Sequence, residues 1–232
     1  MLLLCSVAHT ATDPQIPVLS PASKRGFEEP ADAKRHPTEK LITRYLARWE
    51  SRHTQLLTYP STDTAVAMTY TASSEQRFNG KLFQAANAFD HNYKTAWVED
   101  ESGPGGGAWV SMEGPAPSPM HGDARLLGVL LVSGFAKNQP MFRRNPRPQL
   151  LFVELRCDGS GESSQALSAS YRLSVADTRR PQLFVFGPTH RRALLGRCAF
   201  RATLERTYAG SQFRDASISE IRLVLEHAGS TG

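Results

Sequence analysis

Short apolar runs separated by turn residues are the feature that most constrains the fold of this chain. From residue 64 onward, stretches rich in Val, Leu, Phe and Tyr alternate with segments rich in Gly, Pro, Asn and Asp. Eight of these runs are expected to form strands: Val66–Thr71, Ala108–Met112, Leu126–Val132, Leu150–Arg156, Tyr171–Val175, Gln182–Phe186, Ala199–Thr207 and Ser219–Glu226. Because no long helical pattern lies between them, the sequence predicts an all-β antiparallel sandwich or jelly roll over residues 64–228.

The N-terminal part of the chain has a different pattern, in which three segments are expected. Residues 1–12 combine a short apolar stretch with small residues and resemble part of a signal segment. Residues 13–37 are rich in proline and mixed charge, which predicts a flexible linker. Residues 38–58 are predicted to form an amphipathic helix, interpreted as a docking face against a domain or partner, with a membrane-surface helix as the alternative. Its apolar face would carry Leu41, Ile42, Tyr45, Leu46 and Trp49.

The charge pattern argues against nucleic acid as the main partner. The chain has 27 Lys and Arg against 22 Asp and Glu, a net charge of +5. These basic residues are spread along the chain, and no nucleic-acid-binding motif accompanies them. The same charge suits anionic sugars, lipopolysaccharide or lipid headgroups.

No segment approaches the roughly 20 consecutive apolar residues of a transmembrane helix. We therefore expect a secreted, cell-envelope or periplasmic protein without a transmembrane segment.

The three cysteines do not form a metal-binding pattern. Cys5, Cys157 and Cys198 show no CxxC spacing and no histidine clusters with them, so a zinc site is not expected. Cys157 ends one apolar run and Cys198 begins another. A single disulfide between them and two buried free thiols are both compatible with this pattern.

Three ordered motifs carry a resemblance to a known fold family. They are NAFDHNYKTAW at residues 87–97, GAWVSM at 107–112 and FRDASISEI at 213–221. Together they resemble the discoidin-like, coagulation-factor type C sandwich, which is also called galactose-binding-like. The resemblance implies a jelly-roll β-sandwich that follows a flexible N-terminal segment and one amphipathic helix.

Further stretches are similar to one branch of that family. They are SGFAKN at residues 133–138, FRRNPRP at 142–148 and YAGSQFRD at 208–215. The branch is the NADase-type glycan-binding domain, found beside the catalytic domain in some bacterial NAD-glycohydrolase toxins and in many other bacterial proteins. The resemblance covers residues 70 to 225 and implies a glycan as ligand.

The resemblance also implies a structural calcium ion. Its ligands would be Asp90, Asn92, Thr95 and Glu220, which offer the oxygen atoms that Ca²⁺ prefers. His91 stands where the family has glycine, at a turn position that demands positive φ. The alternative interpretation needs no metal: Asp90 caps the turn, Thr95 bonds to it, and Glu220 pairs with an arginine.

Polar residues on the loops form the candidate ligand site. They are Lys137, Arg143, Arg144, Asn145, Arg147 and Tyr208. Arg147 lies between two prolines, so its guanidinium could bind a sugar carboxylate or sulfate bidentately, or it could clamp two loops by pairing with Asp215. Tyr208 could stack on a ligand or close the end of a sheet. Trp97 and Trp109 are expected to fill the core, with stacking on a sugar as the alternative.

These patterns predict a non-catalytic carbohydrate-binding module of a secreted or cell-envelope bacterial protein. The sequence has no P-loop, dinucleotide fingerprint or nucleophile elbow. Its prominent carboxylates, Asp90, Asp215 and Glu220, all have structural explanations. In the toxin relatives the NAD-glycohydrolase activity resides in a separate domain. The alternative function is a protein–protein interaction or scaffold module with the same fold, in which the helix and basic loops dock a protein partner.

Overall fold

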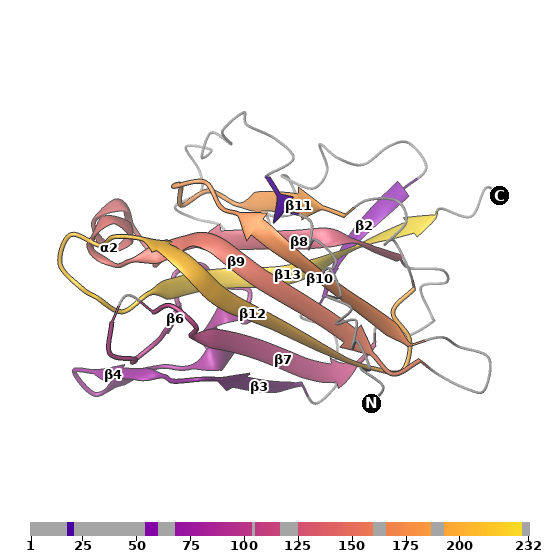
Figure 1. Ribbon diagram of the computed structural model, residues 1–232, viewed down its shortest axis with the longest axis horizontal. Helices are drawn as coiled ribbons and strands as arrows, with labels where there is room; N and C mark the ends of the chain where they lie inside the picture. Colours follow the sequence, from indigo (N-terminus) through magenta and orange to yellow (C-terminus); the bar gives the residue numbers. More distant parts are fainter. Residues whose placement is uncertain are drawn as a thin grey trace, which may run out of the picture.

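The protein is a β-sandwich of two facing sheets (Figure 1). The computed structural model describes residues 18–20, 54–59, 68–103, 105–116, 125–159, 166–186 and 193–228. The all-β sandwich expected from the sequence is therefore confirmed. Within these residues, no helix has the length and apolar character needed to cross a bilayer.

One layer is a six-stranded sheet with the order β1-β10-β9-β12-β7-β3. Its strands are β1 (Val18–Leu19), β10 (Leu167–Ser174), β9 (Arg147–Cys157), β12 (Arg197–Tyr208), β7 (Trp109–Pro115) and β3 (Thr69–Ala72). The other layer is a five-stranded sheet with the order β11-β8-β13-β2, to which β6 adds by pairing with β13. Its strands are β11 (Gln182–Val185), β8 (Arg125–Ser133), β13 (Ser217–Ala228), β2 (Thr54–Tyr59) and β6 (Trp97–Val98).

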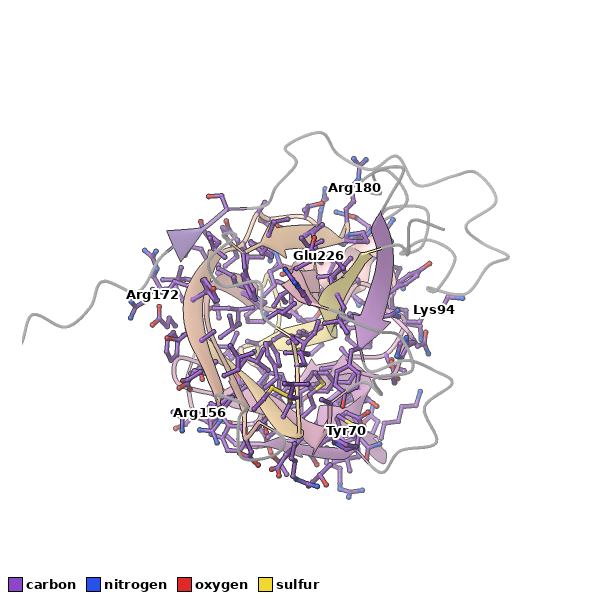
Figure 2. The ribbon with its side chains drawn as sticks, turned by 90° about the vertical axis from the view of Figure 1, so that its right-hand side faces the viewer. Tyr70, Lys94, Arg156, Arg172, Arg180 and Glu226 are labelled. Atoms are coloured by element: carbon purple, nitrogen blue, oxygen red, sulfur yellow. A yellow bond between two sulfur atoms is a disulfide. The ribbon has the colours of Figure 1, made fainter. Side chains whose placement is uncertain are left out.

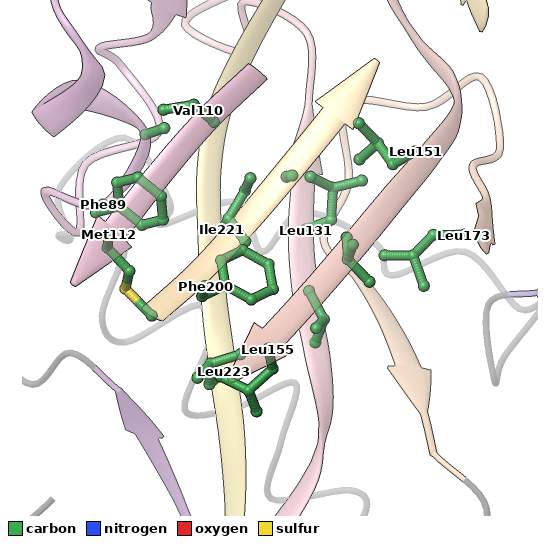
Figure 3. Close-up of a cluster of buried hydrophobic side chains, with 14 of the residues drawn as sticks. Phe89, Val110, Met112, Leu131, Leu151, Leu155, Leu173, Phe200, Ile221 and Leu223 are labelled. Atoms are coloured by element: carbon green, nitrogen blue, oxygen red, sulfur yellow. The ribbon is translucent and has the colours of Figure 1, made fainter. Parts of the chain in front are cut away.

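Alternation along the strands places the core between the two sheets. In β12, Phe200 and Leu204 are buried while Arg201 points outward, as the two-residue period of a strand requires. Leu155 of β9 and Ile221 of β13 belong to the same buried cluster (Figure 3). The middle strands of the five-stranded sheet are buried on both faces. Among the described residues, the polar strand face that is exposed to solvent therefore belongs to the six-stranded sheet.

All eight predicted strands are present, with ends that differ by a few residues. A hairpin of β4 (Gln76–Phe78) and β5 (Lys81–Phe83) was not expected from the sequence. It lies between β3 and the short 3-10 helix η2 (Ala85–Ala88). Its turn residues Asn79 and Gly80 have φ of 48° and 75°. This Asn-Gly pair is the strongest short signal for a two-residue hairpin, because both central residues of such a turn need positive φ.

The N-terminal predictions need two corrections. The helix predicted over residues 38–58 is wrong for residues 54–58, because Thr54–Tyr59 forms β2 and pairs antiparallel with β13. Pairing with an open strand edge overrides the helical periodicity there. Within the predicted linker of residues 13–37, Val18–Leu19 forms β1, which pairs with β10 in parallel. The predicted signal segment and the other linker and helix residues lie outside the described residues.

A disulfide between Cys157 and Cys198 joins β9 to β12. The two residues lie directly opposite each other in the antiparallel register. Both side chains are buried, with exposed fractions of 2% and 4%. Of the two alternatives that the sequence left open, the structure contains the disulfide.

Candidate functional site

The loop between β8 and β9 contains the short helix α2 (Gln139–Arg144). Asn138 is its N-cap, and the side-chain oxygen of Asn138 accepts a hydrogen bond from the backbone N–H of Met141 at 2.9 Å. Asn145 ends the helix, because its backbone N–H and its side-chain amide both donate to the carbonyl of Met141. The Asn145 side chain, predicted as a ligand contact, is therefore engaged in capping and is buried.

The turn after β12 packs directly on the end of α2. Backbone N–H groups of Ser211 and Phe213 donate to the carbonyls of Arg143 and Arg144. This approach requires a glycine at position 210, since a Cβ there would lie 2.4 Å from the carbonyl oxygen of Arg144. Figure 1 shows α2, this turn and the turn after β10 at the same end of the sandwich.

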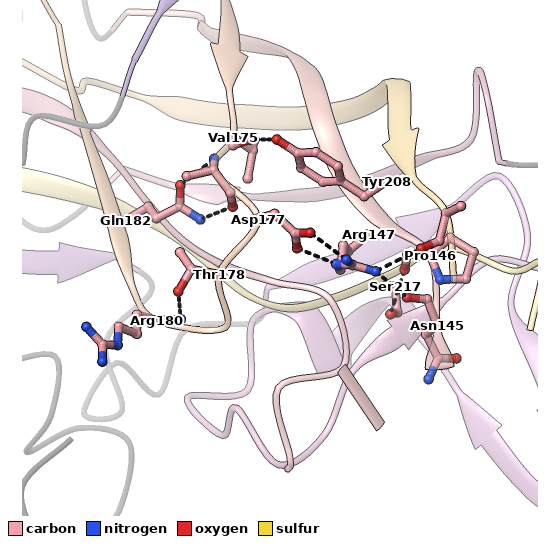
Figure 4. Close-up of polar contacts among 12 residues, drawn as sticks. Asn145, Pro146, Arg147, Val175, Asp177, Thr178, Arg180, Gln182, Tyr208 and Ser217 are labelled. Carbon is pink, nitrogen blue, oxygen red and sulfur yellow. Dashed lines mark hydrogen bonds and ion pairs between the residues drawn. The ribbon is translucent and has the colours of Figure 1, made fainter. Parts of the chain in front are cut away.

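Arg147 locks these three loops together (Figure 4). Its Nε and Nη2 atoms donate to the two carboxylate oxygens of Asp177, at 2.5 and 2.6 Å. Its Nη1 atom donates to the carbonyl of Ala209 at 3.0 Å. The guanidinium carbon also lies 4.9 Å from the ring centroid of Phe142 and 5.6 Å from that of Tyr208. Arg147 is 9% exposed. It therefore holds the loops together, which was the alternative to direct ligand binding.

The partner in that clamp differs from the one suggested by the sequence. Asp177, in the turn after β10, pairs with Arg147, whereas Asp215 accepts a hydrogen bond from Gln76. Tyr208 donates its hydroxyl to the carbonyl of Val175 at 3.0 Å and so ties the end of β12 to the end of β10. This is the sheet-closing role that the sequence left as one of two alternatives.

Six basic side chains surround this braced frame. Three of them, Lys137, Arg143 and Arg144, are predicted site residues and are exposed. The sequence analysis did not single out the other three, which are Arg179, Arg180 and Arg214. We call these six residues the basic loop end. Arg180 projects from the surface (Figure 2).

Two hydrogen bonds to backbone carbonyls bring the members of the basic loop end together. The guanidinium Nη1 of Arg179 donates to the carbonyl of Ala136 at 3.5 Å, which places the Arg179-Arg180 turn beside Lys137. The contact of Phe213 with the end of α2 places the neighbouring Arg214 beside Arg144. The spread of basic residues along the sequence hid this cluster, because it forms where three separate loops meet. Guanidinium groups in such a cluster suit carboxylate and sulfate groups, which accept two parallel hydrogen bonds.

The loop at residues 90–95 is closed by its own hydrogen bonds. The Asp90 carboxylate accepts from the backbone N–H of Asn92 at 2.9 Å and from the hydroxyl of Thr95 at 2.7 Å. The Asn92 carbonyl accepts from the backbone N–H of Thr95 at 2.9 Å. His91 adopts a φ of 61°, the positive value expected at its position. Asp90 thus caps the turn, as in the metal-free interpretation.

Glu220, the fourth predicted calcium ligand, is completely buried on β13. One of its carboxylate oxygens accepts from Nε of Arg222 at 3.1 Å. The other, Oε2, is buried without a hydrogen-bond partner. Burial raises the pKa of Glu220 to about 8; Arg222 and a hydrogen bond from the backbone N–H of His91 oppose this shift, and the charge of nearby Asp90 adds to it.

The described residues place no group of three or more His, Cys, Asp or Glu side chains where it could hold a metal ion. A calcium ion would therefore depend on Asp90 and Glu220 together with amide, hydroxyl and carbonyl oxygens from Asn92 and Thr95. These donors fit Ca²⁺ in chemical type. The Oε2 atom of Glu220, which is buried without a hydrogen-bond partner among the described residues, is the observation that would fit a cation at this place.

The two tryptophans have different roles. Trp97 is fully buried, and its indole N–H donates to the carbonyl of Ser74 at 2.9 Å, so it fills the core as expected. Trp109 does not fill the core, contrary to expectation. Val110 and Met112 face the core, so Trp109 points to the outer side of the six-stranded sheet. The guanidinium of Arg201 lies over its ring at 4.2 Å.

The two-sheet sandwich and its loop-borne site define the class of discoidin-like domains. More particularly, residues 58–224 match the model of the NAD glycohydrolase translocation F5/8 type C domain. The match covers more than half of the chain, which therefore belongs to this family. The resemblance identified from the sequence motifs is confirmed.

Solved structures similar to this chain include the following two. The F5/8 type C domain of a Bacteroides fragilis protein shares 14% identity with a TM-score of 0.41, over 70% of this chain and 93% of that one. The arabinofuranosyltransferase AftD from Mycobacteria shares 14% identity with a TM-score of 0.40, over 72% of this chain and 11% of that one. No curated protein matches the sequence.

Proposed function

We propose that the protein is a non-catalytic glycan-binding module of a secreted or cell-envelope bacterial protein. The observation that carries this proposal is the basic loop end, in which five exposed cations and the half-buried Arg179 surround a frame held by Arg147. A carboxylate or sulfate on a sugar is the chemical group that fits these cations. The family is named for NAD glycohydrolase translocation. Attachment to a surface glycan is a step that such translocation could use.

The frame supports binding because it fixes the loops before a ligand arrives. Arg147 pairs with Asp177, and the Tyr208 hydroxyl donates to the carbonyl of Val175, so little loop ordering remains to oppose association. Single sugar sites of this kind bind with millimolar to micromolar constants, about −4 to −8 kcal/mol. Useful attachment would then depend on several copies acting together.

The Cys157–Cys198 disulfide supports export of the protein. Disulfides persist in secreted, periplasmic and cell-surface proteins and are rare in reducing compartments. This agrees with the expected secreted or cell-envelope location. The short apolar stretch at residues 1–12 would then act as a signal segment.

Replacing Lys137, Arg143 and Arg144 together by alanine is expected to weaken binding to acidic glycans at least tenfold. The reason is loss of three exposed cations from the basic loop end, while the Arg147 frame stays intact. The measurement is a glycan array carrying sulfated, sialylated and neutral sugars, probed with the full chain. A double alanine variant of Arg125 and Arg197, which are exposed at the opposite ends of β8 and β12, serves as the control for loss of positive charge.

Equal binding by the triple variant and the control variant would contradict the role of the basic loop end. A blank array from folded protein would favour the protein–protein interaction module, and a pull-down with the same two variants would then test the same surface. Affinity for acidic glycans should also fall as salt rises, because exposed charges are screened over about 8–10 Å at physiological ionic strength.

We also propose a structural calcium ion at Asp90, Asn92, Thr95 and Glu220. The support is the buried, unpartnered Oε2 atom of Glu220 and the nearby Asp90 carboxylate. A divalent cation there would offset the electrostatic cost of two neighbouring carboxylates.

Calcium is expected to stabilise the protein by about 2.7 kcal/mol when present at a hundredfold excess over its dissociation constant. Thermal unfolding with added CaCl₂ and with a chelator measures this shift. Glu220→Gln should abolish the difference between the two conditions, whereas Glu226→Gln on the same strand should keep it. If wild-type protein unfolds identically with calcium and chelator, the metal-free interpretation of the loop is correct.

A further inference from the structure

The outer face of the six-stranded sheet has an open pocket of about 270 Å³ that lies across β3, β7, β12 and β9. The strand register arranges its lining in two rows. In the first row, Ala199 is flanked by Glu113 on β7 and Arg156 on β9. Two long side chains on either side of a methyl group leave a hollow above Ala199. The pocket therefore results from one small residue on an outward-facing strand position.

The second row supplies hydroxyl and charged groups. Thr71, Ser111, Arg201 and Glu154 occupy successive strands of this row. The hydroxyls of Thr71 and Ser111 lie 2.7 Å apart. Arg201 reaches over the ring of Trp109, which lies next to Ser111 on the same face. Converging hydroxyl and charged groups of this kind are typical of a small-ligand site.

The charges of this pocket are balanced, unlike those of the basic loop end. Its lining contains two glutamates, Glu113 and Glu154, and two arginines, Arg156 and Arg201. Arg156 pairs with Glu154 at 3.3 Å, and Glu113 pairs with the neighbouring Arg197 at 2.6 Å. The two carboxylates would repel an anionic ligand. Carboxylates that accept beside guanidiniums that donate instead match the neighbouring hydroxyls of a neutral sugar.

The pocket lies far from the basic loop end. β9 begins at Arg147 in the loop frame and reaches Arg156 at the pocket. Nine residues separate these two positions, which at about 3.3 Å per residue is about 30 Å along the strand. Arg156 projects outward from the sheet (Figure 2). One ligand group therefore cannot occupy both places.

We infer that this pocket is a second carbohydrate site, which takes a neutral pyranose. The inference rests on the proposed function for the class of ligand, but it needs none of the basic loop residues. Glu113, Glu154 and Arg156 bind the sugar hydroxyls, and the methyl group of Ala199 offers an apolar surface at the base of the pocket. A module with both sites would bind a glycan that carries acidic and neutral sugars at two points, which strengthens attachment.

The test fills the pocket without disturbing the core. Ala199 faces outward and is exposed, so Ala199→Trp should fold normally while its indole occupies the hollow. Ala199→Ser leaves the hollow open and is the matched control. Saturation-transfer NMR with cellotriose, chitotriose, methyl β-galactoside and methyl α-mannoside measures binding to the full chain. We expect transfer to at least one of these sugars, a tenfold or greater loss in Ala199→Trp, and retention in Ala199→Ser.

The triple alanine variant of Lys137, Arg143 and Arg144 separates the two sites. Retained binding of the neutral sugar by this variant supports an independent pocket. Loss of neutral-sugar binding in the triple variant, with binding intact in Ala199→Trp, would overturn the pocket and leave the proposed function standing. Acidic-glycan binding without any neutral-sugar binding would do the same. Failure to bind either class would overturn both proposals.

Discussion

Replacing Cys157 and Cys198 together by alanine is expected to lower the free energy of unfolding by about 4 kcal/mol, the upper part of the usual 2–4 kcal/mol range. The disulfide closes a loop with a sequence separation of 41 residues, and its loss returns that chain entropy to the unfolded state. The measurement is urea unfolding of the wild type and the double variant, each with and without a reductant.

Reductant should lower the stability of the wild type and leave the double variant unchanged. Cys5→Ala retains the bond and should behave as the wild type. Equal unfolding free energies for wild type and double variant would show that the bond adds nothing to folding. A reductant effect that persists in the double variant would assign the effect to something other than this bond.

The position of the disulfide links stability to the pocket. Cys157 and Cys198 are opposite each other, and the adjacent pair in the register is Arg156 with Ala199. The bond therefore joins β9 and β12, the strands that carry Arg156 and Ala199 of the pocket. Reduction should weaken neutral-sugar binding more than acidic-glycan binding, because the basic loop end lies at the other end of β9.

The strand content could be predicted from the sequence because apolar runs of strand length are separated by turn residues. Within β12, the residues from Phe200 to Glu205 also alternate apolar with polar side chains. The Asn79-Gly80 turn was equally visible and predicts the missed hairpin. β2 was misassigned because Thr54–Tyr59 continues a helical periodicity, and its pairing with β13 depends on a strand more than 150 residues away.

The candidate site could be predicted only in part, because much of it depends on which loops meet. The exposure of Lys137, Arg143 and Arg144 follows from their loop and helix-end positions. The pairing of Arg147 with Asp177 does not, because 30 residues separate them and either of two aspartates could have reached Arg147. The pocket on the six-stranded sheet could not be predicted from the sequence, because its lining residues come together only when four strands pair in a particular register.

Arg147→Ala is expected to lower the free energy of unfolding by about 3 kcal/mol, the lower end of the range for breaking a buried ion pair. The lower end applies because the Asp177 side chain is 42% exposed and can be rehydrated. The substitution also removes the bond to Ala209 and the contacts with Phe142 and Tyr208. Arg147→Lys should recover a minority of the loss, because an ammonium cannot make the bidentate pair.

A double-mutant cycle with Asp177→Ala measures the pair itself. Chemical unfolding of the four proteins should give a positive coupling energy of more than 1 kcal/mol, since each single variant removes the same interaction. Glycan binding, measured where every variant is folded, distinguishes the clamp from a direct ligand contact. A clamp predicts that Arg147→Ala and Asp177→Ala both weaken binding, and that Arg147→Ala weakens it more because it also removes the bond to Ala209. Loss of binding in Arg147→Ala with unchanged unfolding would instead assign Arg147 to the ligand and contradict the frame that the hydrogen bonds describe.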